Sequence, residues 1–125
     1  MIPEIIAAIT AANTDFVTID HALSMEPVEN LESEAPAFFV LEGDGKGLDE
    51  EGDACVENVE VRSVKVFIVC KWIDLELYRN QTKAVLRGFQ FKPEQRPLKL
   101  ASSRTIKING EYLWREDVYT TVDYS

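Results

Sequence analysis

The last third of the chain contains VLRGFQFKP (residues 85–93), RPLKL (96–100) and LWREDVY (113–119), in that order. Gly88 tolerates the left-handed backbone that ends many helices, and Pro93 and Pro97 keep the following chain extended. The dipeptide Asn109-Gly110 then favours a tight hairpin turn between two β-prone runs. These stretches predict a helix end, a bend, a hairpin and a closing aromatic strand. None of their residues has the setting of a catalyst.

Working outward, apolar spacing predicts the remaining elements. One helix is expected over residues 3–12, where Ile5, Ile6 and Ile9 share a face, and a second between Asp74 as its N-cap and Gly88. Strands are expected over residues 16–19, 37–41, 56–73, 98–108 and 111–124. The region between residues 21 and 35 has no clear period and is interpreted as irregular.

Residues 56–73 carry the strongest strand signal. Positions 64, 66, 68, 70 and 72 are apolar on one phase, and Phe67 and Val69 make the centre apolar on the other face as well, which indicates a central strand. Val59 and Val61 belong to the opposite phase. The change of phase near residues 62–63 predicts a β-bulge or a bend there.

Charged residues of the second helix and the last strand are assigned to exposed positions. Arg79, Lys83 and Arg87 lie four apart, on the side of the helix opposite its apolar face, and are expected to face solvent. Glu116 and Asp117 are neighbours in a strand, so they point to opposite faces and cannot easily share an acid/base site. They are interpreted as charges on a solvent-facing or subunit-facing side.

Length and composition indicate one domain, residues 1–125, with 46% hydrophobic residues and enough material for one core. The predicted class is α+β: a mostly antiparallel, or mixed, β-sheet of about four to five strands packed against two helices. A long acidic loop is expected over about residues 42–54, which hold four glycines and six acids. The start of the chain lacks the pattern of a secretory signal, and no apolar run is long enough to span a membrane, so action in the cytoplasm is expected.

The net charge of −9 is divided unevenly. Residues 1–60 hold 15 acids and one Lys, a net charge of −14, whereas residues 61–125 hold seven acids and 12 basic residues, a net charge of +5. Unlike halves suit head-to-tail contacts between copies of the chain, although an acidic loop that is merely solvated would give the same count. The acidic half argues against nucleic-acid binding as the main role.

Patterns for catalysis, metals and cofactors are missing. The single histidine, His21, has no recognisable nucleophile around it. The glycine-rich segment 43–47 lacks the Gly-Lys-Ser/Thr ending of a phosphate-binding loop. With Asp44 as the first ligand of a calcium loop, the third and fifth positions are Lys46 and Leu48, which supply no carboxylate. Cys55 and Cys70 suit a reducing compartment and are too few for a zinc site. We therefore expect no catalytic residue, no metal and no cofactor.

Several segments, in order, resemble the tail terminator (tail completion) proteins of tailed bacteriophages. The opening MIPEIIAAI resembles the family's first helix, and LRGFQFKP (86–93) resembles its helix ending in Leu-x-Gly-Trp-x-Pro, with Phe89 at the Trp position. The remaining matches are APAFFV (35–40), VKVFIV (64–69), PLKL (97–100) and LWREDVY (113–119). Ser102-Ser103 departs from the glycines that such chains often carry, and the stretch before the second helix is short.

This resemblance implies a structural virion protein and not an enzyme. Such proteins form a ring, usually of six copies, on the head-proximal end of the tail tube, where they stop tube polymerisation and provide the surface for head–tail joining. The implied partners are further copies of the chain, the tail tube protein and a head–tail connector or neck protein, with no specific nucleic acid and no membrane. The implied location is the virion, with the host cytoplasm during assembly.

For the subunit contact, we expect four acids of one copy to meet three arginines of its neighbour. The acids are Asp49, Glu50, Glu51 and Asp53, and the arginines are Arg96, Arg104 and Arg115. A competing class is a stand-alone acidic protein-binding module or inhibitor that mimics DNA. That class requires acids spread along one face, whereas here they concentrate in one region.

Overall fold

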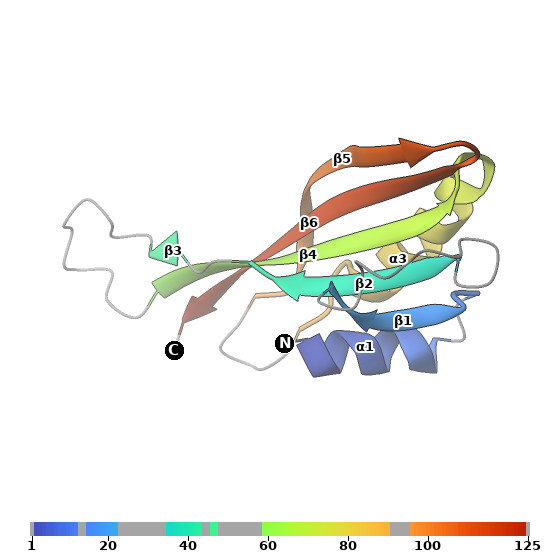
Figure 1. Cartoon of the computed structure of the whole chain (residues 1–125). Coiled ribbons are helices and arrows are strands. Elements are labelled where there is room, and N and C mark those ends of the chain that lie inside the picture. Colours follow the sequence, from blue (N-terminus) through green and yellow to red (C-terminus); the bar gives the residue numbers. More distant parts are fainter. Residues whose placement is uncertain are drawn as a thin grey trace.

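A computed structural model describes residues 2–12, 15–22, 35–43, 46–47, 59–90 and 96–124 of the chain (Figure 1). The elements run in the order α1 (Ile2–Ala11), β1 (Thr18–His21), β2 (Ala37–Glu42), β3 (Lys46–Gly47), β4 (Val59–Lys71), the 3-10 turn η3 (Trp72–Asp74), α3 (Leu75–Leu86), β5 (Lys99–Asn109) and β6 (Tyr112–Tyr124). They form the predicted α+β structure, with both helices on one face of a single sheet.

The strand order of the sheet is β1-β2-β4-β6-β5, and the short β3 pairs with β4 outside this path. β1 runs parallel to β2, and every other pair is antiparallel. β4 is therefore the middle strand, as its two-sided apolar pattern predicts. The edge positions belong to the four-residue β1 and the eleven-residue β5.

The main core lies between the sheet and the two helices. Ile5 and Ile9 of α1 and Leu86 of α3 are fully buried against Phe38, Val40 and the even-numbered apolar residues of β4. Phe16 completes the layer by packing on the rings of Phe38 and Tyr78, with centroids 5.5 and 5.4 Å away. The helical and strand periods in the sequence thus meet in one layer, as expected for a two-layer α+β domain.

A smaller cluster occupies the opposite face of the sheet. It consists of Ala37, Phe39, Phe67, Val69 and Trp114, all of them buried. Phe67 and Val69 alternate with the core residues of β4, and this alternation places them on the second face. The apolar centre of β4 is thereby buried on both sides.

Of the β-bulge or bend predicted near residues 62–63, the bulge is wrong, because β4 pairs with β6 without a break from Val59 to Lys71. The phase changes for another reason. Figure 1 shows the first part of β4 and the last part of β6 continuing beyond the helices, where no helix layer selects which face is apolar. The register shifts fall in β5 instead, at Leu100/Ser102 and Thr105/Lys107.

Three local predictions also need correction. Asp74 is the N-cap residue of α3, as predicted, but it also ends the 3-10 turn η3 and its side chain makes no capping hydrogen bond. The hairpin turn sits one residue later than expected, because Asn109 still pairs with Tyr112 and Gly110 (φ +62°) begins the turn. Within the predicted acidic loop, Glu42 ends β2 and Lys46–Gly47 form β3; the other parts of that loop, apart from Gly43, lie outside the described residues. Gly88, by contrast, has the expected left-handed backbone after α3, with φ +83°.

Cys70 gives a test of how closely this core is packed. Burial, together with the smaller effect of the nearby Asp74 carboxylate, raises the pKa of its thiol to about 12. In a Cys55→Ser background, we expect iodoacetamide to alkylate native Cys70 at pH 8 on the order of 10³-fold more slowly than the urea-unfolded chain, because only the thiolate reacts. Mass spectrometry measures the alkylation rate in each state, and equal rates in the native and unfolded states would contradict this packing.

The same shift sets an alkaline limit to stability. The unfolded chain releases the Cys70 proton near its usual pKa of about 8.5, whereas the folded chain retains it up to about 12. The unfolded state therefore binds fewer protons in this range, and the free energy of unfolding falls as the pH rises above about 8.5. Urea titrations at pH 8 and pH 10.5 should show this loss, and a Cys70→Ala variant should show less of it.

Candidate assembly surface

The sheet face opposite the helices carries a row of cations. Side chains of directly opposed antiparallel residues point to the same side of a sheet, so the register identifies which residues share a face. Trp114 belongs to the buried cluster on that face, and the residues at even positions of β6 point the same way. Their partners on β4 and β5 include five basic residues: Lys65, Lys71, Lys99, Arg104 and Lys107. We call these five residues the cationic face.

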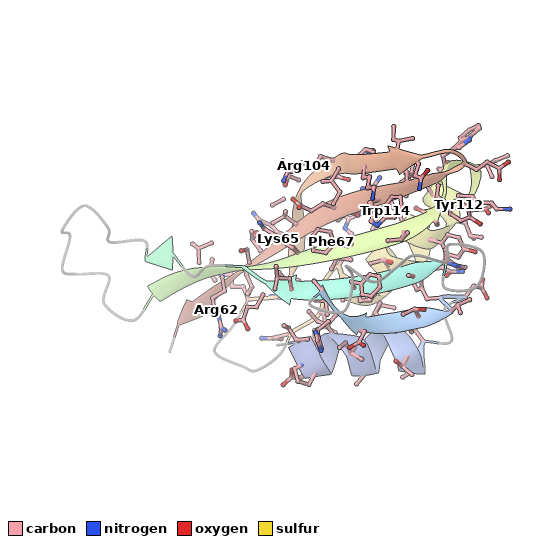
Figure 2. All side chains as sticks on the ribbon, viewed as in Figure 1. Arg62, Lys65, Phe67, Arg104, Tyr112 and Trp114 are labelled. Atoms are coloured by element: carbon pink, nitrogen blue, oxygen red, sulfur yellow. The ribbon has the colours of Figure 1, made fainter. Side chains whose placement is uncertain are left out.

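Figure 2 shows part of this surface, with Lys65 and Phe67 along β4, Tyr112 and Trp114 along β6, and Arg104 on β5. Lys99 and Lys107 are exposed, and the side chains of Arg104 and Lys71 are 69% and 49% exposed. Among the described residues of β4, β5 and β6, Glu116 is the only carboxylate on this face. The face therefore has a net positive charge although the whole chain carries −9.

Two of the cations rest on buried partners in β6. The Arg104 Nε donates to Oε1 of Glu116 over 3.2 Å, and the Lys107 Nζ lies 4.7 Å from the centroid of the Trp114 ring. Glu116 and Trp114 are themselves nearly inaccessible, at 7% and 6% exposure. These contacts hold the stems of Arg104 and Lys107 against the sheet and leave positive charge at the surface.

The helix-covered face carries a different polar group, a buried network that ties α3 to β6 and β5. Asp117 is fully buried and accepts a hydrogen bond from Nε of Arg79 over 3.1 Å and another from the Ser103 hydroxyl. Arg115 then donates to Oγ of Ser103 and to Oγ1 of Thr105, each over 2.8 Å. The network joins the helix to both strands of the hairpin.

The prediction that Glu116 and Asp117 point to opposite faces is confirmed. The prediction that they are surface charges is wrong, because both are buried and each is paired with an arginine. Arg79 is likewise not a solvent-facing residue of α3, since its side chain lies against Asp117 with 19% exposure. The spacing along the helix predicted that Arg79 faces solvent, but a single helix does not reveal that Asp117 of β6 is its partner.

Beyond the helices, residues 59–63 of β4 and 120–124 of β6 form a two-stranded ribbon that β3 extends to three; we call it the arm (Figure 1). At its base, Arg62 pairs with Glu42 of β2, and the Thr121 hydroxyl donates to the carbonyl oxygen of Arg96. No described helix covers the arm. Two-stranded ribbons are marginally stable alone in water, and β3 and the continuous strands β4 and β6 support the arm.

The described part of the chain has few of the features that mark an enzyme site. His21 is exposed, and its Nε2 lies 3.6 Å from Asp20. An open groove of about 370 Å³ runs beside Pro36, Cys70, Tyr78 and Tyr112, where Cys70 is a buried thiol with a raised pKa. Within the described ranges, no three His, Cys, Asp or Glu residues are grouped so that they could hold a metal ion. No helix in those ranges is long and apolar enough to cross a membrane.

The family model of the phage tail terminator protein matches residues 2–124, which is nearly the whole chain. The chain belongs to this family. A search among curated proteins gave no match. Membership of the tail terminator family makes the chain a structural component of a phage tail and confirms the resemblance noted in its helices and strands.

The arginines expected at the subunit contact of this tail terminator do not lie together. Arg104 belongs to the cationic face, whereas Arg115 points to the helix-covered face and is hydrogen-bonded to Ser103 and Thr105. Arg96 is exposed and lies beside the base of the arm, where its amide donates to the carbonyl oxygen of Val122 over 2.9 Å. The four acids, Asp49, Glu50, Glu51 and Asp53, are outside the described residues.

Sequence reasoning missed Lys65, Lys71, Lys99 and Lys107. A signal was available for two of them, since Lys65 and Lys71 alternate with the core residues of β4 and must therefore lie on its second face. The lysines of β5 carried no such signal, because the register shifts at Leu100/Ser102 and Thr105/Lys107 change the phase of that strand twice.

Proposed function

We propose that this protein forms a ring, with six copies as the expected number, that caps the head-proximal end of the tail tube. The ring stops the addition of tube subunits and presents a different surface to the connector or neck protein of the head. No chemical turnover is involved. The action is geometric, because one side of the ring matches the end of the tube and the other side does not offer that docking surface again.

The observation that carries the proposal is the separation of unlike surfaces on one subunit. A ring requires heterologous contacts, in which one patch of a copy meets a different patch of the next. The tail terminator fold has a cationic sheet face, a projecting arm and a first half with a net charge of −14. Complementary charge of this kind favours the correct contact between copies and disfavours the pairing of like faces.

The same observation weighs against the alternative of a stand-alone acidic module that mimics DNA. Such a module needs carboxylates spaced along an exposed surface. The exposed face of β4, β6 and β5 carries cations instead, and Glu116, its one described carboxylate, is buried and paired with Arg104. Membership of a structural family of phage tail proteins adds to the case for the ring.

The proposal is tested by adding the purified protein to the polymerising tube protein of the same phage. Above about six copies per growing tube end, we expect elongation to stop early, so that the mean tube length in electron micrographs falls as more protein is added. The protein should also appear as a ring at one end of each tube, detectable with gold bound to an added affinity tag. Serum albumin at the same concentration is the control.

An unchanged length distribution, or protein bound along the sides of the tubes, would overturn the proposal. Light scattering on the protein alone adds a second reading, in which a ring at high concentration is expected to dissociate on dilution. A protein that stays monomeric when alone must still shorten the tubes for the proposal to hold.

A further inference from the structure

We infer that the cationic face is a docking surface for the acidic segment 49–57 of a second copy of this chain. The inference rests on the proposed ring and names the contact that closes it. The segment contains Asp49, Glu50, Glu51, Asp53 and Glu57 and has no basic residue. Five carboxylates thus stand against the five cations of the docking face.

Within the described residues, the five cations outnumber the carboxylates beside them, so this surface keeps a net positive charge. In the described structure, Arg104 has the buried Glu116 as a partner, Lys107 has the ring of Trp114, and the Lys71 Nζ lies 3.9 Å from the exposed Glu111. A row of like charges along neighbouring strands destabilises the sheet that carries it. An acidic strand or loop laid across β6 and β5 removes this repulsion.

The acidic segment is too short to reach the distant part of the docking face of its own chain. The segment is held between Gly47 and Val59, which lie in the arm. Its 11 residues, from position 48 to position 58, reach at most about 18 Å from these anchors when the chain doubles back. Lys107 lies across β6 from Val69, ten residues along β4 from Val59, which is about 33 Å away.

Lys71 lies farther still along β4, at about 40 Å from Val59. The segment therefore cannot cover Lys71 or Lys107 of its own chain, but an arm that projects from the helix-covered body can carry it to a neighbour. The charge pattern also selects the partner orientation. Two cationic faces repel each other, so the contact is head-to-tail, as a closed ring requires.

Nucleic acid is the other polyanion that such a face can take. It is disfavoured here because the rest of the chain also repels a phosphate backbone that approaches the face. The chain has a net charge of −9, and its first 60 residues have a net charge of −14. An acidic segment of the same protein brings five carboxylates to one place within nine residues. Binding of DNA at this face is one outcome of the test below.

The direct test uses a fluorescent peptide of residues 47–59, with Ser at position 55, and the full-length protein. We expect binding that weakens as salt rises from 50 to 300 mM, because the contact is between exposed charges. Lys71→Glu/Lys107→Glu should weaken binding by about tenfold or more. Lys83→Glu/Arg87→Glu on α3 changes the net charge equally on the other layer of the fold and should change binding by less than about twofold. Circular dichroism establishes that both variants are folded.

A charge exchange between copies gives the second test. Lys71→Glu/Lys107→Glu and Glu50→Lys/Glu51→Lys should each fail to assemble alone at the concentration where the wild type forms rings. Mixed in equal amounts they should assemble, because each reversed face then meets a reversed segment and each normal face meets a normal one. Six positions allow the two variants to alternate around the ring. The assembly is measured by sedimentation velocity, with tube ends added as nuclei if the wild type alone is monomeric.

Peptide binding that ignores the face variant overturns the inference, and so does a DNA duplex of 20 base pairs that binds this face while the peptide does not. Failure of this contact is separable from failure of the ring. Normal capping of tubes by Lys71→Glu/Lys107→Glu would remove the docking contact and leave the ring proposal standing. Peptide binding without any capping by the wild type would remove the ring proposal alone.

Discussion

Asp117→Ala is expected to lower the free energy of unfolding by about 3 kcal/mol or more, because it leaves the Arg79 guanidinium without its carboxylate under α3. Asp117 is fully buried and accepts hydrogen bonds from both Arg79 and Ser103. Its loss therefore removes the link between the helix and the β5–β6 hairpin. Some of the cost is relieved by water, since the Arg79 side chain is 19% exposed.

The neighbouring Glu116→Ala is the matched control. Glu116 is the adjacent residue of β6, is also buried and also pairs with an arginine. The Arg104 side chain, however, is 69% exposed and remains hydrated when its partner is removed. We expect a cost of about 1 kcal/mol or less for this change. Urea unfolding followed by fluorescence measures both variants, and equal losses would contradict the assignment of Asp117 as the buried anchor.

A double-mutant cycle with Arg79→Leu isolates the pair itself. Combining Asp117→Ala with Arg79→Leu should cost less than the sum of the two single changes, because neither charge is then left buried alone. Additive losses would show that Asp117 acts through Ser103 and not through Arg79.

Phe38→Ala is expected to have an effect of similar size, about 3–5 kcal/mol, because it opens a cavity at the centre of the main core. Phe38 is fully buried between β2 and the helices, with the Phe16 ring 5.5 Å away. The core residues around Phe38 cannot close this cavity, because α1 packs on one side of it and the pairing of β2 with β4 fixes the other.

Two residues of the same strand calibrate this loss. Leu41 is 36% exposed, so Leu41→Ala should cost less than about 1 kcal/mol. Phe39→Ala removes the same atoms as Phe38→Ala, but from the smaller cluster on the second face. A result in which Phe38→Ala costs no more than Leu41→Ala would contradict a single tight core between sheet and helices.

Much of the fold was predictable because its signals are local. The two helices follow from the spacing of Ile5 and Ile9 and of Thr82 and Leu86, and all four residues are buried as that spacing requires. The central position of β4 follows from apolar residues on both phases. The bulge was misplaced for a physical reason, since a change of apolar phase also arises where a strand leaves the helix-covered body.

The candidate surface was less predictable. Strand phase alone could have placed Lys65 and Lys71 on the second face of β4, but a single strand does not show which residues of other strands lie beside it. Arg96, Arg104 and Arg115 were grouped by charge and nearness in sequence, and only the register of β5 and β6 separates Arg104 from Arg115. An odd or even position decides the face of a strand residue, and each register shift resets that rule.

The sequence by itself determined the central position of β4, the left-handed glycine after α3 and the charge difference between the two halves of the chain. These are properties of neighbouring residues and of composition. The tertiary structure decided that Asp117 meets Arg79, that Glu116 meets Arg104 and that five cations align on one face. Those outcomes depend on pairing between strands distant in the chain, and no short-range pattern contains that information.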